Sequence, residues 1–246
     1  MSVDMNLIKN EFAECNITVR ENEIMSAHTS FKIGGCADIF AIPNNVEEFC
    51  NSIKIAYKYS IPVFVLGKGS NILVSDSGIR GIVVSTEKLD RITVNGNRLV
   101  CQCGASFTYA AIVARDNGLA GLSFAYGIPG SVGGAVYMNA GAYGGQISDV
   151  VVKSTYYDAV NDVVRECTEH NFGYRESESW YIISSEFELT PGDNATIKAE
   201  MDDYMERRRS KQPLEFPSAG STFKRYPGHF TGQLIEESGL KGIRIG

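Results

Sequence analysis

A glycine-rich loop in the first third of the chain has the groups needed to hold an anion. Residues 63–66 (VFVL) form an apolar run typical of a buried strand, and Gly67, Lys68, Gly69, Ser70 and Asn71 follow directly. Main-chain N–H groups, a hydroxyl and an amide are the donors that a pyrophosphate needs. The loop matches neither the Walker A sequence nor G-x-G-x-x-G. On spacing alone, an ordinary tight turn is an equal alternative.

A second glycine-rich segment, residues 127–144 (GIPGSVGGAVYMNAGAYG), could lie against a flat or phosphorylated ligand. Its glycines could instead serve only to let a helix and a sheet pack closely. Two such loops beside a mixed sheet predict a dinucleotide held by a fold other than the Rossmann fold. The candidate ligand contacts in this segment are Ile128, Gly130, Ser131, Gly133, Gly134, Asn139, Gly141 and Ala142.

Arg175 and Ser221 could add a charge and a hydroxyl to such a site. A guanidinium binds carboxylates with two parallel hydrogen bonds, and a hydroxyl can transfer a proton when a charge or a relay assists it. The local sequence favours plainer roles. Arg175 could pair with Glu176 or Glu178 on the surface, and Ser221 could cap a turn.

Charge is distributed unevenly along the chain. The net charge is -6, which disfavours nucleic acid or an acidic membrane as the main partner. From Arg207 to the last residue, however, eight basic residues stand against three acidic ones, so this part carries +5 and the remainder -11. A basic tail on an acidic body suits a small anionic ligand, although a solvated charged face is the alternative.

The spacing of apolar residues predicts short helices and strands without a regular βαβ alternation, which indicates an α+β fold. We expect a helix over residues 4–15 with Leu7, Ile8 and Phe12 inward, and one from Asn45 with Glu48 completing a capping box. Further expected elements are a hairpin at 92–103 with a type I′ turn at Asn95-Gly96, a helix at 106–117, a hairpin at 150–167, a strand at 181–189 and a helix capped by Asn194.

Composition places the chain among ordinary globular proteins. Its 246 residues, 43% of them hydrophobic and 21% charged, allow one large domain or two modest ones. No apolar run approaches the length of a membrane helix and the N-terminus is acidic, so a cytoplasmic location is expected. The six cysteines form no C-x-x-C pair, and no metal site is predicted. Cys101 and Cys103 share a strand face, as small buried hydrophobes or, less favoured, as a redox pair.

Six segments, in order, resemble the signature segments of the UDP-N-acetylenolpyruvoylglucosamine reductases. They are HTSFKIGG (28–35), GKGSN with LVSD (67–76), IPGSVGGA (128–135), MNAGAYG (138–144), FGYRES (172–177) and PSAGSTFK (217–224). The resemblance implies an α+β fold of the vanillyl-alcohol-oxidase/PCMH type. Two subdomains, about 1–88 and 89–195, would clamp FAD within an FAD-binding domain of residues 1–195. Residues 196–246 would begin an α+β substrate-binding domain, in the family form without an extra tyrosine-bearing loop.

The resemblance also implies an activity in peptidoglycan precursor synthesis. NADPH would reduce non-covalently bound FAD, and the flavin would pass a hydride to the enolpyruvyl ether of a UDP-sugar, UDP-N-acetylglucosamine enolpyruvate, giving UDP-N-acetylmuramate. Arg175 matches the arginine at the substrate carboxylate and Ser221 matches the serine that protonates the carbanion. The positions that match groups gripping the diphosphate are Tyr174, Lys211, Lys224 and Arg225, where some members have Asn in place of Arg225.

The resemblance departs from the family at the C-terminus. The family's third catalytic group, a glutamate, comes from a segment beyond Gly246, and neither Glu236 nor Glu237 matches it. A C-terminally truncated monomer with an intact FAD clamp is therefore expected, and the resemblance does not extend to catalysis by this shortened form. The alternatives are another flavin oxidase of the superfamily, with His28 as a covalent attachment point, or a flavin-binding remnant without turnover.

Overall fold

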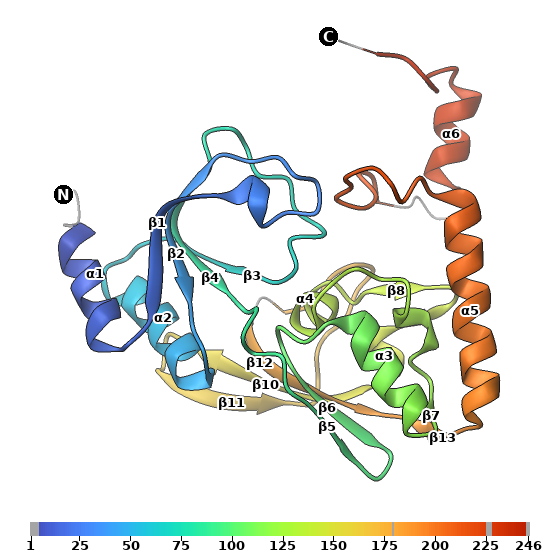
Figure 1. Cartoon of the computed structure of the whole chain (residues 1–246), viewed down its shortest axis with the longest axis horizontal. Helices are drawn as coiled ribbons and strands as arrows, with labels where there is room; N and C mark the ends of the chain where they lie inside the picture. Colours follow the sequence, from blue (N-terminus) through green and yellow to red (C-terminus); the bar gives the residue numbers. More distant parts are fainter. Residues whose placement is uncertain (1–4, 179, 225–227, 245–246) are drawn as a thin grey trace.

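The computed structural model describes residues 5–178, 180–224 and 228–244 (Figure 1). Two β-sheets with helices between and around them form the body, and a long helix runs along one side. Mixed sheets without a regular βαβ repeat confirm the predicted α+β class. Across these residues, no helix combines the length and apolar character needed to cross a membrane.

The first sheet has its strands in the order β1-β2-β4-β3. β1 runs antiparallel to β2, whereas β2 and β3 run parallel to β4. Successive residues of β2 alternate between two apolar clusters: Ile39 and Ala41 lie in the main core, and Phe40 and Ile42 lie in a smaller one on the other face. The strands are β1 (Thr18–Ile24), β2 (Cys36–Ile42), β3 (Val63–Leu66) and β4 (Ile79–Ser85).

Two helices, α1 (Met5–Glu14) and α2 (Val46–Lys58), accompany this sheet (Figure 1). The predicted cap of α2 is confirmed, because Asn45 Oδ1 accepts a hydrogen bond from the Glu48 N–H at 3.0 Å. Ile8 and Phe12 of α1 are fully buried, but the prediction that Leu7 points inward is wrong, since it is 47% exposed. Ile8 and Phe12 are four residues apart and define one stripe, from which Leu7 is rotated by about 100°.

The second sheet is antiparallel throughout, with its strands in the order β11-β10-β12-β6-β5. Its first hairpin corrects the predicted turn. Asn95 pairs with Arg98, so the two turn residues are Gly96 and Asn97, and only Gly96 has a positive φ. This makes the turn type II′ rather than type I′. The strands are β5 (Ile92–Asn95), β6 (Arg98–Gln102), β10 (Val151–Asp158), β11 (Val163–Cys167) and β12 (Tyr181–Glu188).

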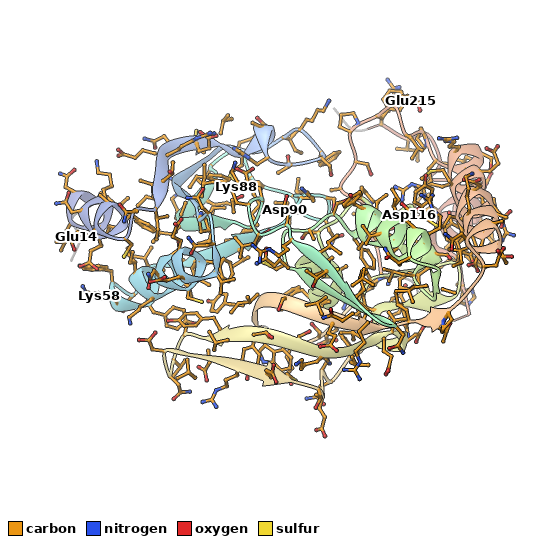
Figure 2. All side chains as sticks on the ribbon, turned by 60° about the horizontal axis from the view of Figure 1, so that its bottom comes forward. Glu14, Lys58, Lys88, Asp90, Asp116 and Glu215 are labelled. Atoms are coloured by element: carbon orange, nitrogen blue, oxygen red, sulfur yellow. The ribbon has the colours of Figure 1, made fainter. Side chains whose placement is uncertain are left out.

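The segment that connects the two sheets is held in place by hydrogen bonds and close packing. The Gly104 N–H donates to Leu89 O at 2.8 Å, and Leu89 is fully buried. A Cβ on Gly104 would lie 1.7 Å from Thr86 O, so no side chain fits there. Lys88 and Asp90, on either side of Leu89, lie near the middle of the molecule in Figure 2. The two sheets therefore hold a fixed relation.

Short helices fill the space beside the second sheet (Figure 1). Ser106 caps α3 and Ser131 caps α4, and one continuous apolar core joins these helices to both sheets. One short helix, η1 (Met25–Ala27), belongs instead to the first sheet, where it follows β1. The other short elements are α3 (Phe107–Asp116), β7 (Leu119–Ala120), η2 (Ser123–Ala125), α4 (Val132–Tyr137), β8 (Gly141–Ala142), β9 (Gly145–Gln146), η3 (Ile147–Asp149) and β13 (Thr190–Pro191).

The helix that runs along the side is α5 (Asn194–Lys211), and α6 (Thr231–Glu237) lies beyond its C-terminal end (Figure 1). The N-cap of α5 is Asp193, whose Oδ2 accepts a hydrogen bond from the Thr196 N–H at 2.8 Å. The prediction of Asn194 as the cap is wrong by one residue, because Asn194 already has its place in the first turn. Ile197 and Met201 are the buried residues of α5.

A buried polar cluster ties β10 to β12 and to the loop after β11. Ser154 Oγ and Ser185 Oγ are 2.8 Å apart, and His170 Nε2 is 2.8 Å from Ser154 Oγ. The His170 ring also stacks on Phe172, with centroids 5.0 Å apart. Burial lowers the pKa of His170 below its usual value, although a backbone hydrogen bond with Thr168 acts in the opposite direction. The cluster is therefore built for a neutral imidazole.

This cluster predicts a pH dependence of stability. A histidine with a lowered pKa in the folded state contributes its full stabilisation above its unfolded pKa of about 6.5, and loses it as the pH falls through that value towards the folded pKa. His170→Gln should therefore flatten the fall in unfolding free energy on acidification, measured by urea denaturation from pH 8 to pH 5. The same substitution at the exposed His229 serves as the control. An unchanged slope in His170→Gln would refute this assignment.

Candidate active site

Four loops converge at one place between the two sheets. The Ser30 N–H donates to Gly69 O at 3.0 Å, which joins the loop before β2 to the loop after β3. Ser30 Oγ donates to Ser218 O at 2.6 Å, and the Ser218 N–H donates back to Ser30 O at 3.2 Å. The segment after α5 is thereby held against the first sheet. The fourth loop is the one before α4, because its Ser131 lies against Gly67.

The loop of residues 67–71 has open main-chain donors. Within the described chain, the N–H groups of Lys68, Gly69, Ser70 and Asn71 donate to no other protein group. Gly69 has a φ of +60°, and a Cβ there would lie 2.0 Å from His28 O. Successive open N–H groups in a tight turn form a concave site for an anion. We call residues 67–71 the first cradle.

A concave surface lies next to the first cradle. It encloses about 290 Å³ and is lined by residues 27–30, 66–68, Ser85 and Glu87. The walls therefore come from the loop before β2, the end of β3 and the end of β4. These are the carboxyl ends of two parallel strands, where ligands bind in sheets of this kind.

The second cradle consists of residues 127–142, around the short helix α4. Ser131 Oγ accepts from the Gly134 N–H at 3.3 Å and so caps α4. A Cβ on Gly67 would lie only 2.2 Å from Ser131 Oγ, and one on Gly130 would lie 3.7 Å from Ser70 Oγ. The two cradles are therefore in direct contact.

Not every glycine of the second cradle faces open space. A Cβ on Gly133 would lie 2.8 Å from Cys103 Cβ, and one on Gly141 would lie 2.6 Å from Gly145 O. The Gly133 N–H also donates to Cys103 O at 2.8 Å. At these two positions glycine lets backbone elements pack, which is the alternative left open by the sequence.

Arg175 reaches the second cradle. It lies on a loop closed by pairing of Gly173 with Glu176, and its own φ is +58°. Its Nη1 donates to Asn139 O at 3.0 Å and its Nη2 to Gly141 O at 2.5 Å. No ion pair with Glu176 or Glu178 forms among the described residues, so the plainer expectation of a surface ion pair is wrong.

Ser221 lies close to the first cradle, next to Gly220. Gly220 has a φ of +82°, and a Cβ there would lie 3.6 Å from Asn71 Oδ1. Tyr174 neighbours Arg175, with the guanidinium 5.5 Å from its ring centroid. Lys211 at the end of α5 and Lys224 are exposed, and neither forms an ion pair or a side-chain hydrogen bond with another described residue. Arg225 lies outside the described residues.

Three contacts at this site were not predicted from the sequence. Ser30 forms the bridge to Ser218 described above, and Arg208 of α5 lies beside Gly127, with Nη1 3.5 Å from the position of a Cβ. Tyr143, directly after the second cradle, stacks on Tyr204 of α5, with centroids 4.4 Å apart. Ser30, Ser218 and Tyr143 stand in the signature segments and Arg208 in the basic tail, but nothing in the sequence indicated these contacts.

The thiols contribute no reactive group to the site. Burial raises the pKa of both Cys101 and Cys103 to about 12, so they stay protonated and act as small apolar side chains. Across the described ranges, no three His, Cys, Asp or Glu side chains are grouped so that they could hold a metal ion.

Residues 37–167 match the family model for the FAD binding domain. The fold is also that of a glucooligosaccharide oxidase from Acremonium strictum, with a TM-score of 0.59 and 16% identity over 77% of this chain and 43% of that one. The two touching cradles fit a dinucleotide, because the N–H groups of residues 68–71 have no protein partner among the described residues and a concave surface of about 290 Å³ lies beside them. Fold and site thus define an FAD-binding flavoprotein.

Residues 212–246 match the model described as the UDP-N-acetylenolpyruvoylglucosamine reductase C-terminal domain. The chain belongs to the UDP-N-acetylenolpyruvoylglucosamine reductase family, whose members are FAD-dependent oxidoreductases of peptidoglycan precursor synthesis. The resemblance found in the sequence and the expected FAD-binding fold are both confirmed.

Curated relatives and a solved structure support this membership. UDP-N-acetylenolpyruvoylglucosamine reductase 2 of Bacillus cereus is 48% identical over 235 residues, covering 93% of this chain and 76% of the relative. The reductase of Clostridium novyi is 47% identical over 233 residues, with the same coverage. The crystal structure of the reductase from Thermus caldophilus has a TM-score of 0.80 at 28% identity, covering 94% of this chain and 82% of that one.

The contact between Gly67 and Ser131 predicts the effect of a single methyl group. Gly67→Ala should displace Ser131 Oγ, open the two cradles and weaken FAD binding at least about tenfold, which corresponds to about 1.4 kcal/mol. Titration with FAD, followed by quenching of flavin fluorescence, measures this.

Two variants control for that experiment. In Gly67→Ala/Ser131→Ala the nearest remaining atom would be the residue 131 Cβ at 3.2 Å, so part of the lost affinity should return. Gly232→Ala, in α6 with nothing within 4 Å, should bind FAD like the wild type. Wild-type affinity in Gly67→Ala would show that FAD does not lie between these cradles.

Proposed function

We propose that this chain binds FAD without a covalent link and uses NADPH to reduce the enolpyruvyl ether of UDP-N-acetylglucosamine enolpyruvate, with Arg175 and Ser221 as the catalytic residues. Bound FAD supplies the hydride. One observation carries the proposal: the two cradles and the segment of Ser221 meet at one place, and Arg175 is hydrogen-bonded to the second cradle. The chain would act as a monomer, with residues 1–195 holding FAD and residues 196–246 belonging to the substrate-binding domain.

The open N–H groups of residues 68–71 would hold the pyrophosphate of FAD, assisted by the Ser70 hydroxyl. The second cradle would lie along the flavin, with main chain near Ile128, Gly130, Gly134 and Ala142. His28 supports a non-covalent link: its Nε2 is 2.7 Å from Glu23 Oε1 and its ring stacks on Phe40 at 4.2 Å. A histidine so engaged is poorly placed as an attachment point, which speaks against the covalent-flavin oxidase alternative.

Arg175 would hold the substrate carboxylate. A guanidinium has five N–H donors, and two of them are used on Asn139 O and Gly141 O. The remaining donors stay available on a side chain that is already oriented. Negative charge that develops on the carboxylate during the reduction would meet a fixed cation, which stabilises the transition state more than the ground state.

Ser221 would give the proton. Hydride addition at the methylene carbon leaves negative charge on the adjacent carbon, and the proton on Ser221 Oγ would neutralise it. A hydroxyl acts as an acid when a nearby charge or a proton relay assists it, and Lys224 follows three residues later. Tyr174, Lys211, Lys224 and Arg225 would bind the diphosphate of the UDP-sugar, which matches the basic character of the tail.

The reaction is tested by following the flavin colour. FAD-loaded protein mixed with NADPH under anaerobic conditions should lose its visible absorbance, and later addition of the enolpyruvyl UDP-sugar should restore it. NADH in place of NADPH tests the preference between the two. A sugar or hydroxy-acid oxidase would instead bleach with its own substrate, and a remnant without turnover would not bleach at all.

Loss of the Ser221 proton should affect only the second half of this cycle. Ser221→Ala is expected to slow the reoxidation of reduced flavin by the UDP-sugar by about 10²–10⁴-fold, while bleaching by NADPH keeps its wild-type rate. Thr222→Ala, one residue away and also exposed, serves as the matched control. Equal reoxidation rates in Ser221→Ala and wild type, in stopped-flow measurements, would remove Ser221 from its proposed role.

A further inference from the structure

Asn139 occupies a backbone position where glycine is the usual residue. It follows α4 with a φ of +39°. Its N–H donates to Val136 O at 3.0 Å, and the Ala140 N–H donates to Ala135 O at 2.8 Å. These two bonds form a Schellman motif with Asn139 at its left-handed residue, where glycine carries no steric penalty. If the end of the helix were the only requirement, glycine would serve better.

The side chain of Asn139 is directed at protein rather than at open space. It is 4% exposed, Nδ2 donates to Gly173 O at 3.0 Å, and Oδ1 accepts from the Ser148 N–H at 3.0 Å. The first bond holds the loop that carries Arg175, and the second holds η3. A residue whose amide is used in this way is a poor flavin contact, which was the role expected from the sequence.

The main chain of Asn139 also holds Arg175 directly. Asn139 O accepts from Arg175 Nη1, and Gly141 O, two residues later, accepts from Nη2. Ser177 Oγ adds a further bond to Tyr137 O at 2.8 Å, so the loop of residues 171–178 is fixed at both sides of Arg175. One residue thus determines the position of the loop through its side chain and of the guanidinium through its carbonyl.

We propose that Asn139 is a positioning residue for Arg175 and not a ligand of FAD. The proposal rests on the role proposed above for Arg175. By holding Gly173 and the guanidinium at the same time, Asn139 keeps the free N–H donors of Arg175 directed to one place. A displacement of about 1 Å in such a group is enough to slow a reaction by about 100-fold.

The substitution Asn139→Gly separates the side chain from the backbone motif. Glycine keeps the left-handed conformation and the end of α4, and removes only the two side-chain bonds. Asn16→Gly is a closely matched control. Asn16 has a φ of +57° at the end of α1, with the same pair of bonds, Asn16 N to Ala13 O and Ile17 N to Phe12 O, but its side chain is exposed.

Three measurements distinguish the possible roles. In Asn139→Gly, amide hydrogen exchange at Ser148 and in residues 173–176 should accelerate, because the Ser148 N–H loses its acceptor and the loop loses its tie. FAD affinity and the rate of bleaching by NADPH should stay within about twofold of the wild type. Reoxidation by the UDP-sugar should slow by about 100-fold. Asn16→Gly should change none of these.

A double-mutant cycle tests whether Asn139 acts through Arg175. Asn139→Gly should cause no further loss of reoxidation rate in an Arg175→Ala background. Additive losses, or FAD binding weakened more than tenfold in Asn139→Gly, would overturn the proposal. If Arg175→Ala itself reoxidises at the wild-type rate, the proposed role of Arg175 fails instead.

A second variant covers the case in which Asn139→Gly does not fold. Asn139→Asp keeps an acceptor for the Ser148 N–H but sets a carboxylate oxygen against Gly173 O. It should therefore keep slow exchange at Ser148, show faster exchange at 173–176, and lose reoxidation rate in the same way. Wild-type exchange at 173–176 in this variant would contradict the assigned contact.

Discussion

The site depends on one close approach, between the main chain of Gly67 and the hydroxyl of Ser131. Gly67 begins the loop after β3 of the first sheet, Ser131 precedes α4 beside the second sheet, and no side-chain atom on Gly67 fits between them. The same hydroxyl caps α4, so the position of the helix, the second cradle and the first cradle are fixed together. Because the connection through Leu89 and Gly104 is pinned as well, the sheets cannot separate without breaking these contacts. Cofactor binding therefore draws on the packing of the whole body.

Glycine is required at different positions of the two cradles for different physical reasons. Gly69 needs its positive φ and leaves no space beside His28 O, which forms the concave turn with open donors. At Gly133 and Gly141, by contrast, a Cβ would lie too close to neighbouring protein atoms, so glycine there allows close backbone packing. A glycine-rich motif thus combines residues that form a concave turn with residues that allow the backbone beneath it to pack closely. Spacing alone does not separate the two kinds.

Local patterns predicted the elements that depend on local physics. The Asn45 cap, the buried Ile8 and Phe12 of α1, and the strand before Gly67 all follow from periodicity and turn chemistry. Errors of one residue arose where two neighbours offer the same chemistry: Asp193 rather than Asn194 caps α5, and Gly96-Asn97 rather than Asn95-Gly96 forms the turn. Strand pairing decided the second case, because register fixes which residues are left for the turn.

The candidate site was predictable as a set of motifs but not as an arrangement. The segments of Gly67, Ser131 and Arg175 could be named from their residues, whereas the Ser30–Ser218 bridge and the contact of Arg208 with Gly127 arise only from the three-dimensional fold. Asn139 shows the limit most clearly. From the sequence, an amide between two glycine-rich stretches is predicted to contact a ligand. The structure shows instead that its side chain is hydrogen-bonded to Gly173 and Ser148.

The bridge between Ser30 and Ser218 also bears on the order of assembly. The two residues are separated by 188 positions along the chain, whereas both cradles lie within residues 67–142. Contacts between residues so far apart in sequence form slowly, because the chain loses the entropy of closing the intervening loop before the contact contributes any stabilising free energy. During synthesis at about 5–20 residues per second, the cradles emerge several seconds before Ser218 does. The two cradles can thus form on the ribosome before the Ser30–Ser218 bridge closes.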